Sequence, residues 1–233
     1  MGKIKYTPMR IVYHLKYLYL RCKEKRKVKN LGLGLYGKHA KLALPTVISN
    51  PSHVFLHDYT RIHGQSIIYN YTGKFIMKEY SGASIELLVV TGNHRPTVGI
   101  PHYMLPLSRI NDKETDIIVE EDVWIGARVT LLAGAHIGRG AVIGASSLVN
   151  KDVPPYAVAV GSPTRIVASK FTLEQILEHE KALYPEEKRF TREYLERLFE
   201  TYYQGKKSIG LSSDLDKCGF YEFMRRNNYD YIG

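Results

Sequence analysis

A repeat of six residues runs through the middle of the sequence and restricts its fold more than any other feature. From Ile117 onward the chain divides into blocks such as VWIGAR, VTLLAG, AHIGRG and AVIGAS. One large aliphatic residue recurs six positions apart throughout: Val119, Ile125, Leu131, Ile137, Ile143 and Val149. This period fits neither the 3.6-residue turn of a helix nor the alternation of a strand. It predicts short strands joined by tight corners, three to a coil, with one apolar residue per face pointing inward.

A second set of positions in the repeat supports the same geometry. The residues four positions after each aliphatic are small or β-branched, as a side chain tucked beside a corner must be: Val123, Val129, Ala135, Ala141, Ser147 and Val153. Glycine follows three of the aliphatics, where it relieves the backbone of the corner. A weaker tract lies upstream, with Leu56, Ile62 and Ile68 again six apart. In FIMKEYSGASIELLVV, which follows that tract, the six-residue register blurs and no corners can be placed.

These patterns divide the chain into three parts. We expect a basic helical arm over residues 1–41, a repeat domain over residues 42–169 and a helical extension over residues 170–233. The extension opens with the capping box TLEQ at Thr172 and Gln175, and Pro185 is predicted to begin a second helix. An excursion of about residues 92–116, GNHRPTVGIPHYMLPLSRINDKET, interrupts the repeat. Loops this long in a compact domain usually carry function.

The net charge of +10 comes from the amino-terminal arm. Residues 1–41 contain twelve Lys or Arg and one acidic residue, whereas the rest of the chain is close to neutral. Ile11, Leu15 and Leu18 fall at helical spacing, so the arm is predicted to be an amphipathic helix. Such a helix can cap the main domain with a solvated basic face, or residues 1–30 can contact an anionic membrane surface. No nucleic-acid partner is expected, because no nucleic-acid-binding motif accompanies the charge.

Several other patterns limit the class of protein. Gly32, Gly34 and Gly37 have the spacing of a dinucleotide fingerprint, but no strand and helix flank them, so GLGLYG is interpreted as a flexible joint. Cys22 and Cys218 match no metal-ligand spacing, and no metal site is expected. The sequence has no secretory signal pattern and no apolar stretch of membrane-spanning length. We therefore expect a cytoplasmic protein, with the membrane contact of the arm left open.

Taken together, the repeat, TGNHRP, VWIGA and VIGASSLVNKDVPPYAVAVGSPTRIV resemble the hexapeptide-repeat acyltransferases. The nearest branch is that of sugar O-acetyltransferases, which act on galactosides, maltose or surface polysaccharides. The resemblance covers roughly residues 42–168. It implies a mainly β protein built on a left-handed parallel β-helix, a homotrimer with active sites between subunits, and acetyl-CoA as acetyl donor.

His94, in GNHRP, matches the catalytic histidine of that family and inherits its role as general base. The chemistry agrees, because a hydroxyl is a weak nucleophile near neutral pH and histidine titrates in the range needed to take its proton. The resemblance also assigns positions along acetyl-CoA: Trp124, Gly144, Ala145, Ser146, Lys151, Gly161 and Arg165. Lys151 and Arg165 are the cations expected near the adenosine 3′-phosphate.

The acceptor is expected to be a saccharide hydroxyl. Candidate contacts are Asn70, which matches a family asparagine near the reacting centre, and residues of the excursion: Arg95, His102, Tyr103, Arg109 and Asp112. Of these, His102 is the one rival base. Two alternatives stay open: N-acetylation of an amino sugar or xenobiotic by the same histidine, and a catalytically silent trimeric scaffold. A scaffold gives no reason to keep His94, Trp124 and Lys151 together.

Overall fold

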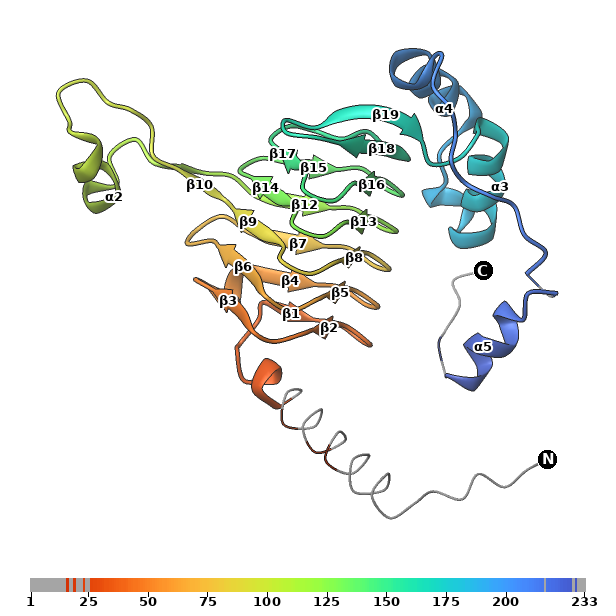
Figure 1. Ribbon diagram of the computed structural model, residues 1–233, viewed down its shortest axis with the longest axis horizontal. Helices are drawn as coiled ribbons and strands as arrows, with labels where there is room; N and C mark the ends of the chain where they lie inside the picture. Colours follow the sequence, from red (N-terminus) through yellow and green to blue (C-terminus); the bar gives the residue numbers. More distant parts are fainter. Residues whose placement is uncertain are drawn as a thin grey trace.

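The computed structural model describes residues 16, 19, 23, 26–215, 217–227 and 229, and its centre is a solenoid of short parallel strands (Figure 1). The first sheet contains β1 (Leu35–Tyr36), β4 (Val54–Leu56), β7 (Phe75–Met77), β12 (Ile117–Val119) and β15 (His136–Ile137). The second contains β2 (Lys41–Leu42), β5 (Arg61–Ile62), β8 (Gly82–Ala83), β13 (Trp124–Ile125), β16 (Val142–Ile143), β18 (Ala157–Val160) and β19 (Arg165–Ser169). The third contains β3 (Thr46–Ile48), β6 (Ser66–Tyr69), β9 (Leu88–Val90), β14 (Thr130–Leu132) and β17 (Leu148–Val149). The predicted parallel β-helix is confirmed.

Burial of the repeat aliphatics holds the coils together. All six residues of the strong repeat are 0 % exposed, as are Leu56, Ile62 and Ile68 of the weaker tract. The stretch without assigned corners continues the same register, because Met77, Ala83 and Val89 lie six apart and are also fully buried. The pattern was hard to detect there because alanine fills one inward position and unbranched methionine another.

Extra residues are inserted at the corner between the third sheet and the first, which we call the arm corner. After β3 the chain forms a short 3-10 turn, η1 (Pro51–His53), and after β9 it leaves the solenoid as the excursion. Because the excursion lies within one coil, Phe75 pairs with Ile117 although they are far apart in sequence. Asn50, Asn70 and Thr91 occupy successive coils at this corner. Asn70 binds the backbone N–H and C=O of Asn50 through its side chain, which joins the two coils.

The solenoid begins at Leu35, earlier than the predicted boundary at residue 42. Two of the three glycines interpreted as a flexible joint are packed instead: a Cβ on Gly34 would lie 2.3 Å from the carbonyl oxygen of Ser52, and one on Gly37 2.5 Å from Asp58 Oδ1. Glycine is needed there because the first coil lies tightly on the second. Of the basic arm, residues 16, 19, 23 and 26–29 are helical. The apolar stripe at Ile11, Leu15 and Leu18 lies outside the described residues.

Helices of the carboxyl-terminal extension cover the last coils. The predicted capping box forms at the start of α3 (Leu173–Leu183). Pro185 precedes the 3-10 turn η3 (Glu186–Lys188) rather than a full helix, and α4 (Arg192–Leu198) starts at the Thr191 cap before continuing into a π-helical turn, η4 (Phe199–Tyr203). Buried Glu180 fixes α3 to the solenoid by accepting hydrogen bonds from Tyr156 Oη at 2.6 Å and Arg139 Nη1 at 3.0 Å. The last helix, α5 (Phe220–Arg226), lies beside the lower coils (Figure 1).

Candidate active site

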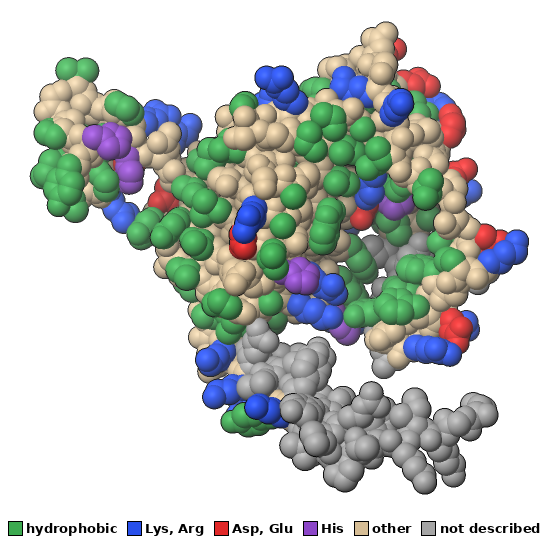
Figure 2. All heavy atoms as spheres, in the orientation of Figure 1, with side chains coloured by type: hydrophobic (Ala, Val, Ile, Leu, Met, Phe, Trp, Pro, Cys, Tyr) green, Lys and Arg blue, Asp and Glu red, His purple; other side chains and the backbone are tan. Residues whose placement is uncertain are grey.

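The predicted excursion is an arm that projects away from the solenoid (Figure 1). Its stem is an antiparallel ribbon of β10 (Gly92–Asn93) and β11 (Lys113–Glu114), and its tip carries η2 (His102–Met104) and α2 (Leu105–Ser108). Apolar and histidine side chains gather at the tip (Figure 2). Tyr103 is 80 % exposed there, whereas Leu105 is fully buried beneath it. The arm is therefore a folded element with an exposed apolar tip.

Glu114 anchors the stem of the arm to the body. One of its carboxylate oxygens, Oε2, accepts hydrogen bonds from the backbone N–H groups of Tyr71, Thr72 and Gly73, at 3.2, 2.9 and 2.7 Å. The hydroxyl of Thr91 donates to the same oxygen at 2.9 Å. Burial by itself would raise the pKa of Glu114, but these four donors favour the charged form and hold the pKa below its usual range. No motif around Glu114 indicates this role.

His94 and Asp112 meet at the outer end of that stem. Register brings them together, because Asn93 pairs with Lys113 and the next residue on each strand faces its counterpart. His94 Nδ1 lies 2.9 Å from Asp112 Oδ1, with the histidine side chain 44 % exposed. When Nδ1–H donates to the carboxylate, the lone pair of the ring lies on Nε2, which is the arrangement of a general base. Asp112, expected to contact the acceptor, lies within hydrogen-bond distance of His94 in this structure.

The other arm candidates take different positions. Arg95, His102 and Tyr103 are exposed on the arm. Arg109 places its guanidinium 5.2 Å from the ring centre of Tyr71, so it lies between arm and body. The amide of Asn70 is fully buried and engaged by Asn50, so in this chain it holds a corner rather than facing the surface.

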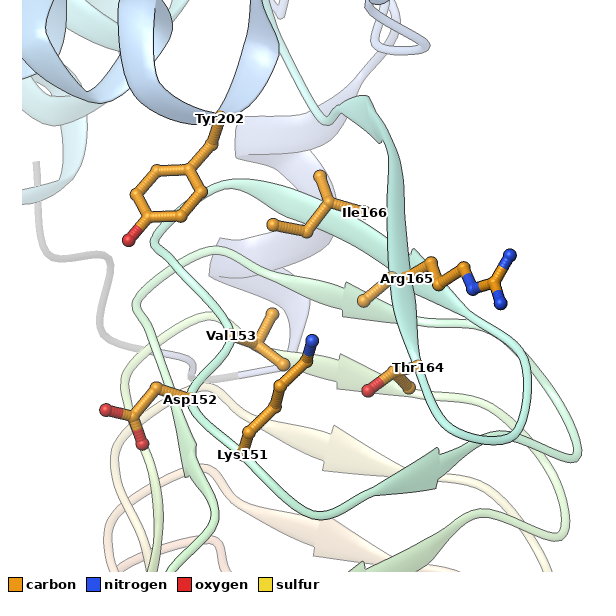
Figure 3. A pocket seen from close by; sticks show the side chains of 8 residues that line it. Lys151, Asp152, Val153, Thr164, Arg165, Ile166 and Tyr202 are labelled. Atoms are coloured by element: carbon orange, nitrogen blue, oxygen red, sulfur yellow. The ribbon is translucent and has the colours of Figure 1, made fainter.

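Lys151 and Arg165, predicted to bind the phosphate of coenzyme A, line one cavity of about 640 Å³ (Figure 3). Val153 and Ile166 supply its apolar wall, and Tyr202 of η4 reaches over it from the helical extension. Thr164 also lines the cavity, and its buried Oγ1 has no hydrogen-bond partner within the part of the chain that the structure describes. Sequence reasoning missed Thr164 and Tyr202, since neither belongs to the repeat pattern.

Trp124 lies on the outer face of β13 with 46 % of its surface exposed, which agrees with its predicted outward position. Its ring covers Gly82 on the neighbouring strand, where a Cβ would come within 3.1 Å of the indole. Ala145 and Ser146 are exposed at the corner after β16, beside the partly exposed Gly144. Gly161 donates its N–H to the buried Ser147 Oγ at 3.0 Å. None of these residues lines the cavity of Lys151 and Arg165.

The structure thus brings the candidates together in two groups. His94 and Asp112 form one group on the arm, and Lys151 and Arg165 form the other at the end of the solenoid. Both His94 and Lys151 follow strands of the third sheet, at the arm corner. Among the described residues, no group of three or more His, Cys, Asp or Glu side chains is placed to hold a metal ion.

Residues 116–151 match the family described as "Bacterial transferase hexapeptide (six repeats)". The chain carries the hexapeptide repeat of bacterial transferases. A chloramphenicol acetyltransferase of Klebsiella aerogenes is 45 % identical over 64 residues, which cover 28 % of this chain and 30 % of that protein. The chain therefore aligns with less than a third of the length of that relative. The predicted resemblance to hexapeptide-repeat acyltransferases is confirmed.

Solved structures show the same fold. A hexapeptide-repeat acetyltransferase of Vibrio cholerae, complexed with acetyl coenzyme A, matches with a TM-score of 0.56 and 23 % identity over 64 % of this chain and 77 % of the other. A maltose O-acetyltransferase of Clostridium difficile 630 matches with a TM-score of 0.54 and 23 % identity, covering 64 % of this chain and 88 % of the other. At this identity the likeness concerns the fold, and the predicted left-handed β-helix with a helical extension is confirmed.

Replacing Glu114 by Gln is expected to loosen the stem. Hydrogen exchange at Tyr71, Thr72 and Gly73 should accelerate near neutral pH, because a neutral amide oxygen accepts these bonds more weakly than a carboxylate. Because the pKa of Glu114 is lowered, its stabilisation of the stem depends on pH. That stabilisation is present above the ordinary carboxyl pKa and is lost as the pH falls through the lower native value. The wild-type stem should therefore approach the behaviour of the variant in acid. Hydrogen–deuterium exchange read by mass spectrometry measures this difference.

The Asp116→Asn variant is the matched control, since Asp116 Oδ1 accepts a single N–H, from Lys74, just outside the stem. It should leave exchange at residues 71–73 unchanged. Equal exchange in wild type and Glu114→Gln across this pH range would show that the carboxylate does not hold the arm.

Proposed function

We propose that the protein transfers an acetyl group from acetyl-CoA to a hydroxyl of a saccharide, with His94 as general base. The hydrogen bond between His94 Nδ1 and Asp112 carries the proposal, because it fixes the imidazole and leaves Nε2 available to a substrate. The acetyltransferase names of the relatives and the acetyl-CoA bound to the neighbouring fold support the donor.

The reaction requires no covalent intermediate on the protein. Nε2 of His94 takes the proton of the acceptor hydroxyl as its oxygen attacks the thioester carbonyl. The resulting tetrahedral species collapses by expelling the thiolate of coenzyme A, which leaves as the thiol when the imidazolium returns the proton. The products are an acetyl ester and free coenzyme A. Throughout this cycle Asp112 keeps the ring oriented and stabilises its transient positive charge.

Coenzyme A would lie along the edge of the second sheet. Lys151 and Arg165 would bind the 3′-phosphate, and the unpartnered hydroxyl of Thr164 is a further donor in that cavity. The small residues Gly144, Ala145 and Ser146, together with Gly161, would let the pantetheine arm pass close to the backbone. Trp124 would pack beside the reacting end. The maltose O-acetyltransferase neighbour supports a sugar acceptor, for which Arg95, His102, Tyr103 and Arg109 are the contacts that we propose on the arm.

A xenobiotic acceptor is the second candidate, because the sequence relative is a chloramphenicol acetyltransferase. The same histidine could deprotonate a hydroxyl or an amine. A panel of neutral sugars, amino sugars and chloramphenicol distinguishes these acceptors by the release of free thiol from acetyl-CoA.

His94→Ala should lower kcat with the preferred acceptor by roughly 10²–10⁴-fold, the usual contribution of a general base. Asp112→Asn should lower kcat while leaving the KM for acetyl-CoA close to wild type, because the amide still fits but no longer favours the productive tautomer. Thiol release over a range of acetyl-CoA concentrations gives kcat and KM for both variants, with His136→Ala, a surface histidine bound to Glu120, as control. Wild-type turnover in His94→Ala would exclude the mechanism, and turnover by no acceptor would favour the scaffold.

We propose further that the enzyme is a homotrimer whose sites lie between subunits. The arm supports this, since it carries His94 away from its own solenoid and ends in an exposed apolar tip (Figure 2). A neighbouring copy would then supply the coenzyme A groove facing each arm.

Mixing two inactive variants tests this arrangement. His94→Ala removes the base, and Ala145→Trp, at an exposed corner, blocks the proposed path of pantetheine. Randomly mixed trimers should recover about a quarter of wild-type activity, because one cleft in four pairs an intact arm with an intact groove. Sites built within one chain would give no recovery on mixing.

The basic amino-terminal arm is proposed to bring the enzyme to an anionic membrane surface, where lipid-linked glycans are assembled. No helix among the described residues combines the length and apolar character needed to cross a bilayer. Because residues 1–41 carry an excess of Lys and Arg, sedimentation with vesicles containing anionic lipid should be strong at low salt and weaken as salt rises. A chain lacking residues 1–30 should remain in solution; equal sedimentation of both forms would rule out this role.

A further inference from the structure

A second cavity lies on the lower coils, away from the proposed coenzyme A site. It has a volume of about 250 Å³ and lies between the solenoid and the part of the chain that carries α5 and Tyr229, which we call the carboxyl-terminal segment. Figure 2 shows histidine and basic side chains gathered at this lower edge of the solenoid. The cavity is lined by His39, Lys41, Tyr59, Thr60, Arg61, Tyr80, Phe223, Met224 and Tyr229.

One wall of the cavity is a ladder of aromatic residues at successive corners. His39 stacks on Tyr59 and Tyr59 on Tyr80, each pair with ring centres 4.8 Å apart. All three residues have positive φ angles, of 58°, 59° and 62°. The left-handed region is unfavourable for such residues, and the equivalent corner of a higher coil uses Gly140. The turn itself therefore does not require aromatic residues. Stacking of their rings offsets part of the free-energy cost of the left-handed backbone.

The adjoining wall carries two cations side by side. Lys41 and Arg61 are paired residues of neighbouring parallel strands, β2 and β5, and both are exposed. Like charges at paired positions repel. Neither forms a salt bridge with an acidic side chain that the structure describes, whereas Lys78, Arg128, Arg139 and Lys170 of the same solenoid each have a carboxylate partner. Two adjacent cations that no carboxylate of the described residues balances favour an anion.

The carboxyl-terminal segment closes the cavity from outside. Tyr229 approaches His39 and Tyr59 edge-on, at 5.6 and 5.9 Å between ring centres, and packs against Phe223 at 6.1 Å. Tyrosine and histidine combine an apolar ring with a polar group that can donate or accept a hydrogen bond. This combination suits a sugar, whose surface alternates C–H and hydroxyl groups. The volume is below that of drug-sized ligand pockets, which indicates a ligand of monosaccharide size.

We propose that this cavity binds an anionic monosaccharide, a sugar carrying a phosphate or carboxylate. Lys41 and Arg61 bind the anion, and the aromatic wall of His39, Tyr59, Tyr80 and Tyr229 contacts the sugar. The site does not depend on acetyl transfer, and its occupation requires neither His94 nor acetyl-CoA. Because α5 and Tyr229 form one wall, ligand binding would also hold the carboxyl-terminal segment against the solenoid.

Calorimetric titration with glucose 1-phosphate tests the proposal on the full chain. The protein is first saturated with coenzyme A, so that the cavity of Lys151 and Arg165 does not compete for the probe. Glucose 1-phosphate should bind at least tenfold more tightly than glucose or inorganic phosphate, since each of these offers only half of the ligand. Glucuronic acid should bind in the same cavity, because a carboxylate supplies the charge.

The Lys41→Ser/Arg61→Ser double variant should weaken glucose 1-phosphate binding by tenfold or more, to the level of glucose. Lys206→Ser/Lys207→Ser is the matched control, because it removes the same charge from an exposed loop after η4. Circular dichroism verifies that both variants are folded, and Tyr59→Leu should weaken glucose 1-phosphate more than inorganic phosphate.

Several results would overturn the proposal. One is the absence of binding up to about 10 mM probe, a concentration that would detect even weak recognition. Others are equal affinity in the Lys41→Ser/Arg61→Ser variant and wild type, or an equal loss in the Lys206→Ser/Lys207→Ser control. Inorganic phosphate binding as tightly as glucose 1-phosphate would reduce the site to a simple anion site. None of these outcomes bears on the role of His94 in acetyl transfer.

Discussion

The stacking of one buried aliphatic residue per strand is the interaction on which the rest of the structure depends. Each coil supplies an inward side chain to each of three sheets, and the residues above and below it in the stack are its main apolar neighbours. The repeat therefore has to keep its register from coil to coil, because a slip of one residue would turn the aliphatic outward. Met77, Ala83 and Val89 show that the identity of the inward residue can vary as long as its position does not.

The same constraint explains where the chemistry lies. A solenoid tolerates insertions only at its corners, and here they occur at the arm corner, where Asn50, Asn70 and Thr91 hold successive coils together. The arm leaves from this reinforced position, and Glu114 binds three backbone N–H groups of the coil below. His94 is thus fixed to a rigid scaffold through a short two-stranded stem, although the arm itself extends into solvent.

Charge in the solenoid follows two distinct arrangements. Around the helical extension, Arg139, Glu180 and Lys170 are paired, since a buried charge without a partner is costly. At the two cavities, by contrast, the described part of the chain gives Lys151, Arg165, Lys41 and Arg61 no acidic partner in a salt bridge. Cations that a fold does not use for its own stability are available to a ligand, and both cavities combine them with aromatic side chains.

The sequence by itself determined the coils and the excursion, and it singled out His94 as the candidate general base. Six-residue periodicity and a local motif are both properties of neighbouring residues in the chain. It also marked Lys151 and Arg165, through resemblance, although their common cavity needed the fold. Only the tertiary structure decided which carboxylate lies beside His94. Asp112 is distant in sequence, and the antiparallel stem that opposes the two depends on the anchoring of Glu114. The ladder of His39, Tyr59 and Tyr80 was equally hidden, since these residues lie about one coil apart and become neighbours only when the coils stack.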